Sequence, residues 1–260
     1  MIGASLFLIL AAPLAAQTSQ LQDNTALRAA AVETDTVTTA PKAAQPVTDE
    51  MRGDIFMARK MYREAVEAYR LGGTSAVLTN KIGIAYHQMI ELDQAQRHYE
   101  RAIKMSPAYS EAINNLGAIY YAKKSYRKAV SQYKKALKVS PNSASIHSNL
   151  GTAYFARKKY KEAFASYQKA LELDPEVFEH RGSNGVLLQE RSVQERAKFH
   201  FYLAKTYAKA GQVERALQYM RKAIEEGFKE RNKFMEDSEF TAIRELPEFQ
   251  QLLTMEVRVL

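Results

Sequence analysis

The feature of this sequence that most restricts its fold is a 34-residue repeat in the middle of the chain. Two consecutive blocks begin at Ser110 and at Ala144. The same residue types recur 34 positions apart: Leu116-Gly117, Tyr120, Ala129, Tyr133, Ala136 and Pro141 return as Leu150-Gly151, Tyr154, Ala163, Tyr167, Ala170 and Pro175. A fixed period of this length indicates one supersecondary unit that is stacked on copies of itself.

Within each block the apolar residues predict two helices joined by a short turn. Ile113, Leu116 and Tyr120 are spaced i, i+3, i+7, which places them on one face of a helix. A second apolar stripe begins at Ala129 and ends before Pro141, because proline lacks an N–H group and disfavours helix in the residue before it. Gly117 has no side chain where the first helix would meet the second. We therefore expect the two helix axes to approach closely at that point.

These positions resemble the signature of the tetratricopeptide repeat, which has a Leu-Gly pair, a Tyr, two Ala residues flanking an aromatic residue, and a closing Pro. The resemblance implies an all-α fold, a right-handed α-solenoid of about five helix-turn-helix units with a C-terminal capping segment. Stacking follows from the physics of the unit, because one helical hairpin cannot bury both of its faces alone.

The same pattern extends in both directions from the central blocks. Repeats are predicted near residues 46–75, 76–109, 110–143, 144–177 and 197–228, so the array would span residues 46–228. An insertion at residues 176–195 breaks the period before the last repeat, and it either forms a loop or packs over an edge of the array. Residues 229–260 are expected to form the cap, with Phe240 and Phe249 sealing the last helix pair.

The N-terminal segment predicts export. Residues 1–16 are apolar and uncharged, as in the apolar region of a secretory signal, with a plausible cleavage point after Ala16. Residues 17–45 are rich in Ala, Thr and Gln, which predicts a disordered linker. We expect an exported protein, periplasmic or extracellular. The alternative for residues 1–16 is an uncleaved anchor that tethers the chain to the membrane.

The sequence gives no sign of catalytic chemistry. Its five His residues show no metal-ligand spacing such as HExxH, and it contains no Cys. Neither a GxSxG nucleophile motif nor a phosphate-binding loop is present. We therefore expect no enzyme activity, no catalytic residue, no bound metal and no cofactor.

Positive charge is concentrated in the middle of the chain. Residues 101–171 contain fourteen Lys or Arg residues and two acidic ones, a net charge of +12, whereas the whole chain carries +8. The predicted basic patch consists of Lys123, Lys124, Arg127, Lys128, Lys158, Lys159 and Lys161. Such a patch can steer an acidic partner or dock on an anionic envelope surface. The alternative is that it only keeps the protein soluble. Nucleic acid is not an expected partner, because the aromatic residues nearby occupy repeat-core positions.

The first helices of tetratricopeptide arrays line a groove, so the resemblance implies a partner-binding site there. Its expected members are Asn80, Ile84, His87, Asn114, Tyr121, Ser148, Phe155, Lys198, Phe201 and Lys205. Tyr121 and Phe155 each follow a core tyrosine by one residue. One residue is about 100° of helix rotation, which would turn both rings toward the groove as anchors. The alternative is that both rings pack beneath the next repeat. Lys198 and Lys205 would favour an acidic end of the ligand.

The sequence thus predicts a non-enzymatic scaffold that binds a protein or peptide partner in a bacterial envelope. Two alternatives stay open. One is a surface-binding module whose basic patch docks on anionic lipid or polysaccharide. The other is an accessory subunit of an enzyme complex.

Overall fold

The computed structural model describes residues 46–179 and 192–255, and within these ranges all regular secondary structure is helical. Residues 47–260 form one unit of the chain, to which the following description is confined. The expected signal segment at 1–16 and linker at 17–45 lie outside the described residues, as does most of the predicted insertion. Among the helices of the described ranges, none has the length and hydropathy of a membrane span.

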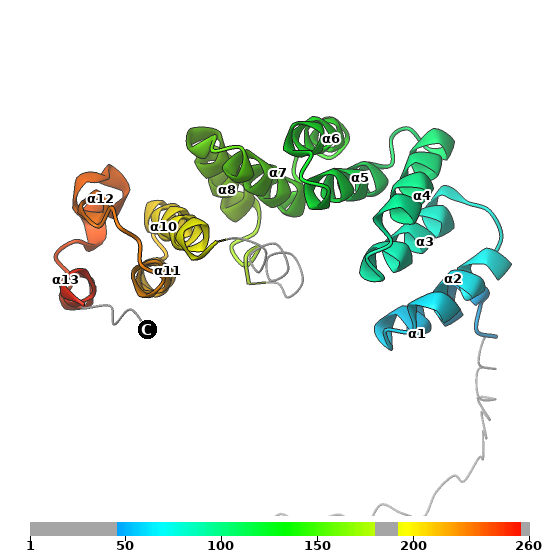
Figure 1. Ribbon diagram of the computed structural model, residues 1–260, viewed down its shortest axis with the longest axis horizontal. Coiled ribbons are helices and arrows are strands. Elements are labelled where there is room, and N and C mark those ends of the chain that lie inside the picture. The colour runs from blue at the N-terminus through cyan, green and yellow to red at the C-terminus, as the bar shows by residue number, and fades with distance from the viewer. Residues whose placement is uncertain (1–45, 180–191, 256–260) are drawn as a thin grey trace, which may run out of the picture. The chain divides into compact units, whose positions relative to one another are not determined.

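Ten helices of the described ranges form five consecutive pairs (Figure 1). The pairs are α1 (Asp49–Ala58) with α2 (Tyr62–Leu71), α3 (Ala76–Gln88) with α4 (Leu92–Met105), α5 (Ser110–Ala122) with α6 (Tyr126–Val139), α7 (Ala144–Ala156) with α8 (Tyr160–Leu173), and α10 (Val193–Lys209) with α11 (Val213–Glu225). The second helix of each pair also packs on the first helix of the next pair, from α2 on α3 to α8 on α10. The prediction of an all-α solenoid of five units is confirmed.

A short helical segment closes the C-terminal end. It consists of α12 (Asn232–Glu236), the 3-10 helix η1 (Ser238–Ile243) and α13 (Pro247–Thr254), and it packs on α10 and α11. Phe234, Phe240 and Phe249 are completely buried. Their rings continue an aromatic cluster that includes Phe201 of α10, whose centroid lies 5.1 Å from that of Phe234. The segment therefore acts as the expected cap.

The two helices of a pair meet where a glycine faces an aromatic ring. A Cβ atom added to Gly117 would lie 2.6 Å from Cε1 of Tyr133, which is closer than such atoms can approach. The same contact joins Gly83 with Tyr99 and Gly151 with Tyr167 in the neighbouring pairs. In the last pair the equivalent residues are Ala204 and Met220, and both are fully buried. Ala204 has a methyl group that the glycines lack, and Met220 on the facing helix is thinner and more flexible than the tyrosine of the other pairs.

The turns inside the pairs repeat one backbone conformation. Lys60, Ile90, Lys124 and Lys158 all adopt left-handed φ angles, between 56° and 63°, and Gly211 takes this place in the last pair. In the third pair the N–H of Lys124 donates to the carbonyl of Tyr121, which satisfies a carbonyl at the end of α5. Non-glycine residues rarely adopt this conformation, and the cost is greatest for β-branched Ile90.

The first helix of the array differs from its successors in burial. Ile55 of α1 is 42% exposed, whereas Ala85 and Ile119, which stand at the equivalent places in the next two pairs, are fully buried. The reason is geometric: in those two pairs the preceding repeat covers this position. Arg52 likewise stands where Ile82 and Leu116 are buried. A polar residue at the outer face is typical of a terminal repeat.

The glycine–tyrosine contact makes a quantitative prediction. Gly117→Ala should destabilise the array by ~1–3 kcal/mol, because its methyl group overpacks against the Tyr133 ring. Combining it with Tyr133→Met should recover much of this loss, since Ala204 and Met220 already form that combination. Urea unfolding of the wild type, both single variants and the double variant measures the coupling. Strictly additive losses would contradict the proposed pairing.

Candidate partner-binding face

Amide side chains link the first helices of consecutive pairs. The Nδ2 group of Asn115 on α5 donates to Oδ1 of Asn80 on α3 over 3.1 Å. Asn149 on α7 donates to Oδ1 of Asn114 on α5, also over 3.1 Å. In each case the donor follows its acceptor by 35 residues, one more than the repeat period. We call Asn80, Asn114, Asn115 and Asn149 the amide ladder.

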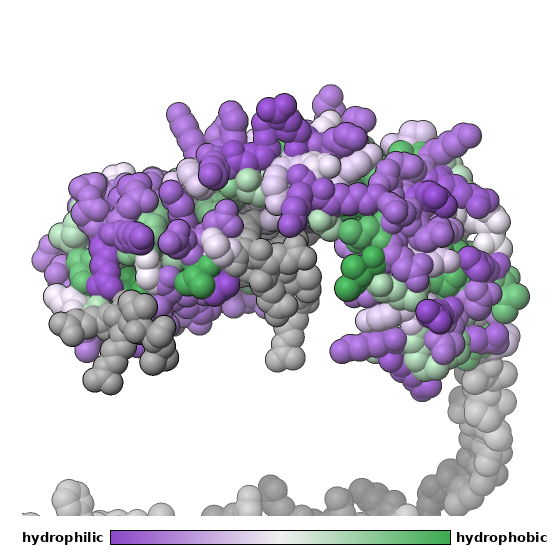
Figure 2. Space-filling view, viewed as in Figure 1, coloured by the Kyte–Doolittle hydropathy of each residue, from purple (hydrophilic) through white to green (hydrophobic). Residues whose placement is uncertain are grey.

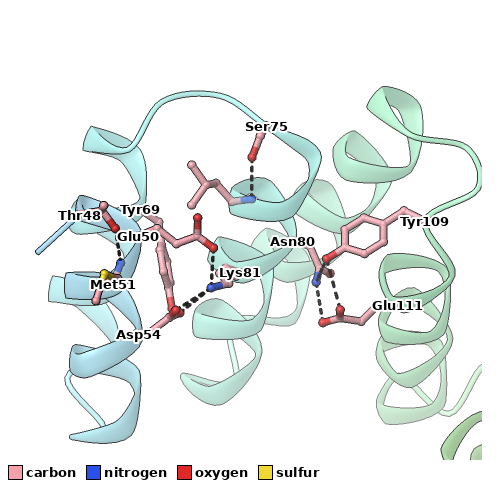
Figure 3. A network of polar contacts seen from close by, with 11 residues as sticks. Thr48, Glu50, Met51, Asp54, Tyr69, Ser75, Asn80, Lys81, Tyr109 and Glu111 are labelled. Carbon is pink, nitrogen blue, oxygen red and sulfur yellow. Dashed lines mark hydrogen bonds and ion pairs between the residues drawn. The ribbon is translucent and has the colours of Figure 1, made fainter. Parts of the chain in front are cut away.

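Asn80 is the buried end of this ladder, and all of its polar atoms have partners. Its side chain is completely buried. Besides accepting from Asn115, it donates from Nδ2 to the Glu111 carboxylate over 3.0 Å and to the Tyr109 hydroxyl over 3.3 Å (Figure 3). A buried amide is tolerated only when it is hydrogen-bonded in this way. Asn114, Asn115 and Asn149 are half-buried, so they stay partly accessible to solvent.

An ion pair holds the equivalent place between α1 and α3. Nζ of Lys81 lies 2.8 Å from Oε1 of Glu50 and 2.8 Å from Oδ1 of Asp54, and the Tyr69 hydroxyl donates to the same Asp54 oxygen over 2.7 Å (Figure 3). Partial burial acts to lower the pKa of Lys81, but the hydrogen bonds and charges of the two carboxylates outweigh it and raise the pKa. Burial and the neighbouring Asp54 carboxylate raise the pKa of Tyr69. The link between α1 and α3 is therefore an ion pair, whereas Asn–Asn hydrogen bonds link α3 to α5 and α5 to α7.

The ladder ends at α10. Tyr202 stands where α7 has Asn149, and its ring stacks on that of Tyr160 with centroids 5.2 Å apart. Nζ of Lys198 also lies over the Tyr160 ring, 4.6 Å from its centroid. The junction between the fourth and fifth pairs thus relies on aromatic rings instead of amides.

Several residues expected in an open groove are buried between helices. This set comprises Asn80 (0% exposed), Tyr121 (8%), Ser148 (2%), Phe155 (4%) and Phe201 (2%). Tyr121 packs against Tyr126 of its own pair, and Phe155 meets Phe199 of the next pair edge-on at 5.5 Å. The expectation that Tyr121 and Phe155 are exposed anchors is therefore wrong. Tyr121 also belongs to a core cluster with Ile146 and Leu150 of α7, so both rings pack beneath the next repeat, as the alternative had it.

The two lysines expected to attract an acidic ligand are already engaged by the cap. Nζ of Lys205 lies 2.8 Å from Oδ2 of Asp237 and 3.2 Å from Oε2 of Glu239. Lys198 lies 3.6 Å from Oε1 of Glu230. The expectation of an open basic end at Lys198 and Lys205 is corrected, because carboxylates of the cap neutralise it.

Three of the expected residues stay at the surface. Ile84, His87 and Asn114 are half-buried and lie on the first helices α3 and α5. Burial lowers the pKa of His87, which favours the neutral imidazole. Asn115 and Asn149 were not among the predicted site residues, although the sequence carries a signal for both. An amide recurs 35 residues apart at 80 and 115 and again at 114 and 149, and this spacing differs from the repeat period by one.

The basic patch divides into paired and unpaired residues. Lys123 forms an ion pair with Asp93 at 2.6 Å, and Lys159 with Glu162 at 3.2 Å. The remaining members are exposed and form no ion pair with any described residue: Lys124, Arg127, Lys128, Lys158 and Lys161. In the part of the chain that the structure describes, no group of three His, Asp or Glu side chains could hold a metal ion.

The ladder predicts unequal roles for its members. Asn80→Ala should cost ~1–3 kcal/mol of unfolding free energy, because it leaves the Asn115 amide and the Glu111 carboxylate short of a partner. Asn149→Ala, at the half-exposed end, should cost ~1 kcal/mol or less, because water can replace its hydrogen bond. Urea titrations of the two variants test this. A larger loss for Asn149→Ala would contradict the assignment of Asn80 as the structural end.

We compared the chain with known protein families and solved structures. Four family models described as TPR repeat or tetratricopeptide repeat match residues 117–157, 144–177, 80–133 and 200–226. No curated protein matches the sequence.

Similar solved structures include MamA residues 41 to the end from Desulfovibrio magneticus RS-1, with 19% identity, 68% of this chain and 92% of that chain covered, and a TM-score of 0.48. MamA of MSR-1 shows 24% identity, covers 69% of this chain and 95% of that chain, and has a TM-score of 0.46. YrrB, described as a TPR protein with an unusual peptide-binding site, shows 20% identity over 54% of this chain and 70% of that chain, with a TM-score of 0.44. From its helix pairs and the four matching family models, this chain belongs to the tetratricopeptide repeat family.

Proposed function

We propose that this chain is a non-catalytic scaffold that binds an extended segment of a protein partner along the first helices α3, α5 and α7. The observation that carries the proposal is the amide ladder. Its half-buried members Asn114, Asn115 and Asn149 form a row on consecutive first helices. An extended peptide presents alternating N–H and C=O groups, and a carboxamide can both donate and accept. A row of amides suits such a ligand.

The internal hydrogen bonds leave part of each amide available. The rungs use Nδ2 of Asn115 and Asn149 as donors and Oδ1 of Asn80 and Asn114 as acceptors. Among the described residues, none donates a hydrogen bond to Oδ1 of Asn115 or of Asn149. The rungs also fix the side-chain rotamers, so a ligand would meet pre-oriented groups and less side-chain entropy would be lost on binding. Ile84 and His87, half-buried on α3, add apolar contact beside the amides.

Peptide binding should depend on the Asn114–Asn149 hydrogen bond of the ladder. Asn114→Ala combined with Asn149→Ala removes both partners of one hydrogen bond, so no buried group is left unpaired and the fold should persist. We expect this variant to bind peptide ligands at least tenfold more weakly, which corresponds to ~1.4 kcal/mol. Ligands come from selecting random displayed peptides on the wild-type protein, and fluorescence anisotropy measures their affinity.

Lys124→Ala with Lys158→Ala serves as the control, because both lysines are exposed in turns away from the ladder. Its affinity should stay within about twofold of the wild type, since surface substitutions away from the ligand have small effects. Selected peptides that bind the asparagine variant as well as the wild type would defeat the proposal that the ladder is the binding site.

We also propose that the chain acts outside the cytoplasm, in the periplasm or the extracellular space. The support is the apolar, uncharged run of residues 1–16, which suits a secretory signal. Expression of the full chain in a bacterium, followed by cell fractionation and mass spectrometry of the N-terminal peptide, tests this. We expect the protein in the periplasmic or medium fraction with Gln17 first, or at the membrane with Met1 retained. Recovery in the cytosol with residues 1–16 intact would contradict export.

A further inference from the structure

A groove lies between the second helices α4 and α6, with part of α5 beneath it. Side chains of α4, α5 and α6 enclose a groove of about 570 Å³. Its floor is apolar, with Ile103, Ile113, Leu116 and Tyr120, and Val139 is 41% exposed at its edge. We call this the outer groove. It uses a different side of α5 from the amide ladder, because Asn114 and Asn115 are absent from its lining.

The rim of the outer groove is mainly basic. Lys135 and Lys138 of α6 line it, both are exposed, and neither forms an ion pair with a described residue. Glu100 is the one carboxylate in its lining. Lys128 of the basic patch lies beyond, with Nζ 5.5 Å from the centroid of the Tyr120 ring. Figure 2 shows hydrophilic side chains projecting over the α6 region at the top of the view.

The outer groove lies in the basic segment of the chain. Residues 101–171, which contribute most of its lining, carry +12, so the remaining residues carry −4 out of the total of +8. Lysines without carboxylate partners around an apolar floor are electrostatically complementary to a ligand that is acidic at its edges and apolar at its centre.

The shape of the site distinguishes a peptide from a flat anionic surface. Ile113 and Leu116 on the floor are each only 5% exposed, so an occupant must insert a side chain to reach them. A bilayer surface would contact the projecting lysines without entering the groove. The Tyr120 hydroxyl, for which no hydrogen bond joins another described residue, can donate to a group that enters. These features favour a peptide segment over a membrane surface as the occupant.

We propose that the outer groove is a docking site for an acidic protein segment that inserts one large apolar side chain between α4 and α6. This interaction goes beyond the ladder, since it uses another side of α5 together with the second helices α4 and α6, and a ligand of defined charge. A partner held on the first helices and an acidic segment held in the outer groove could occupy the array together, because the two sites share no residue.

The test uses two synthetic peptides of equal charge. The first is a fluorescent decapeptide of Glu and Ser with one central Leu, and in the second Ser replaces that Leu. We expect the Leu peptide to bind the full chain at least tenfold more tightly than the Ser peptide in fluorescence anisotropy. Lys135→Glu with Lys138→Glu should weaken binding of the Leu peptide at least tenfold, and Val139→Ser should weaken it about threefold.

Lys124→Glu with Lys158→Glu is the matched control, because it makes the same charge change in the turns, away from the groove. It should alter affinity less than threefold. Circular dichroism checks the helical content of every variant, and Lys135→Ala with Lys138→Ala replaces the glutamate pair if that pair unfolds. Equal affinity for the two peptides, equal loss in the two charge variants, or no binding would each overturn the proposal. A third outcome is that the wild type binds phosphatidylserine vesicles, that both charge variants weaken this binding equally, and that the two peptides bind alike. This outcome would assign the basic patch to a membrane surface instead.

Discussion

The contact on which the rest of the array depends is the one between a glycine of the first helix and an aromatic ring of the second. Gly83, Gly117 and Gly151 each receive a tyrosine ring 16 residues later, and these rings are almost completely buried. Because the ring takes the space of a missing side chain, it fixes both the separation and the rotation of the two helices. That rotation decides which side chains face the neighbouring pair. The polar links between pairs, the buried rings at the junctions and the exposed second-helix surface all follow from it.

The junctions between pairs change in character along the chain. An ion pair centred on Lys81 links α1 to α3, carboxamides link α3 to α5 and α5 to α7, and stacked aromatic rings replace them at α10. Polar links fix register because they need matched partners, whereas ring contacts tolerate a wider range of positions. The change coincides with the 53-residue separation of Gly151 and Ala204, where the 34-residue period is interrupted. Beyond that point the ladder has no rung, so a ligand that follows the amides would end its contacts at α7.

The fold could be predicted from the sequence because its determinants are periodic. The Leu-Gly, Tyr and Ala positions recur with a fixed offset, and each has one physical role in every copy. The site was harder to predict, for two reasons. Tyr121 and Phe155 each lie one residue after a core position. A side chain at such a place can face either the groove or the next repeat, and helix periodicity alone does not distinguish the two. Lys198 and Lys205 appeared free because their partners Glu230, Asp237 and Glu239 come from the cap, and no local pattern pairs residues so far apart.

The carboxylates of the cap have a thermodynamic consequence for any ligand of α10. Asp237 and Glu239 form ion pairs with Lys205, as the carboxylate of an acidic ligand would. An acidic ligand of α10 must therefore displace them first, which leaves these two carboxylates without their cation. The binding free energy of that ligand is then reduced by the free energy of the ion pairs between Lys205 and the cap. Release of the cap from Lys205 and binding of a ligand to α10 are therefore linked equilibria. The cap is therefore a built-in competitor as well as a lid on the last helix pair. Affinity of α10 for anions could be tuned by substitutions in η1 that never touch the ligand.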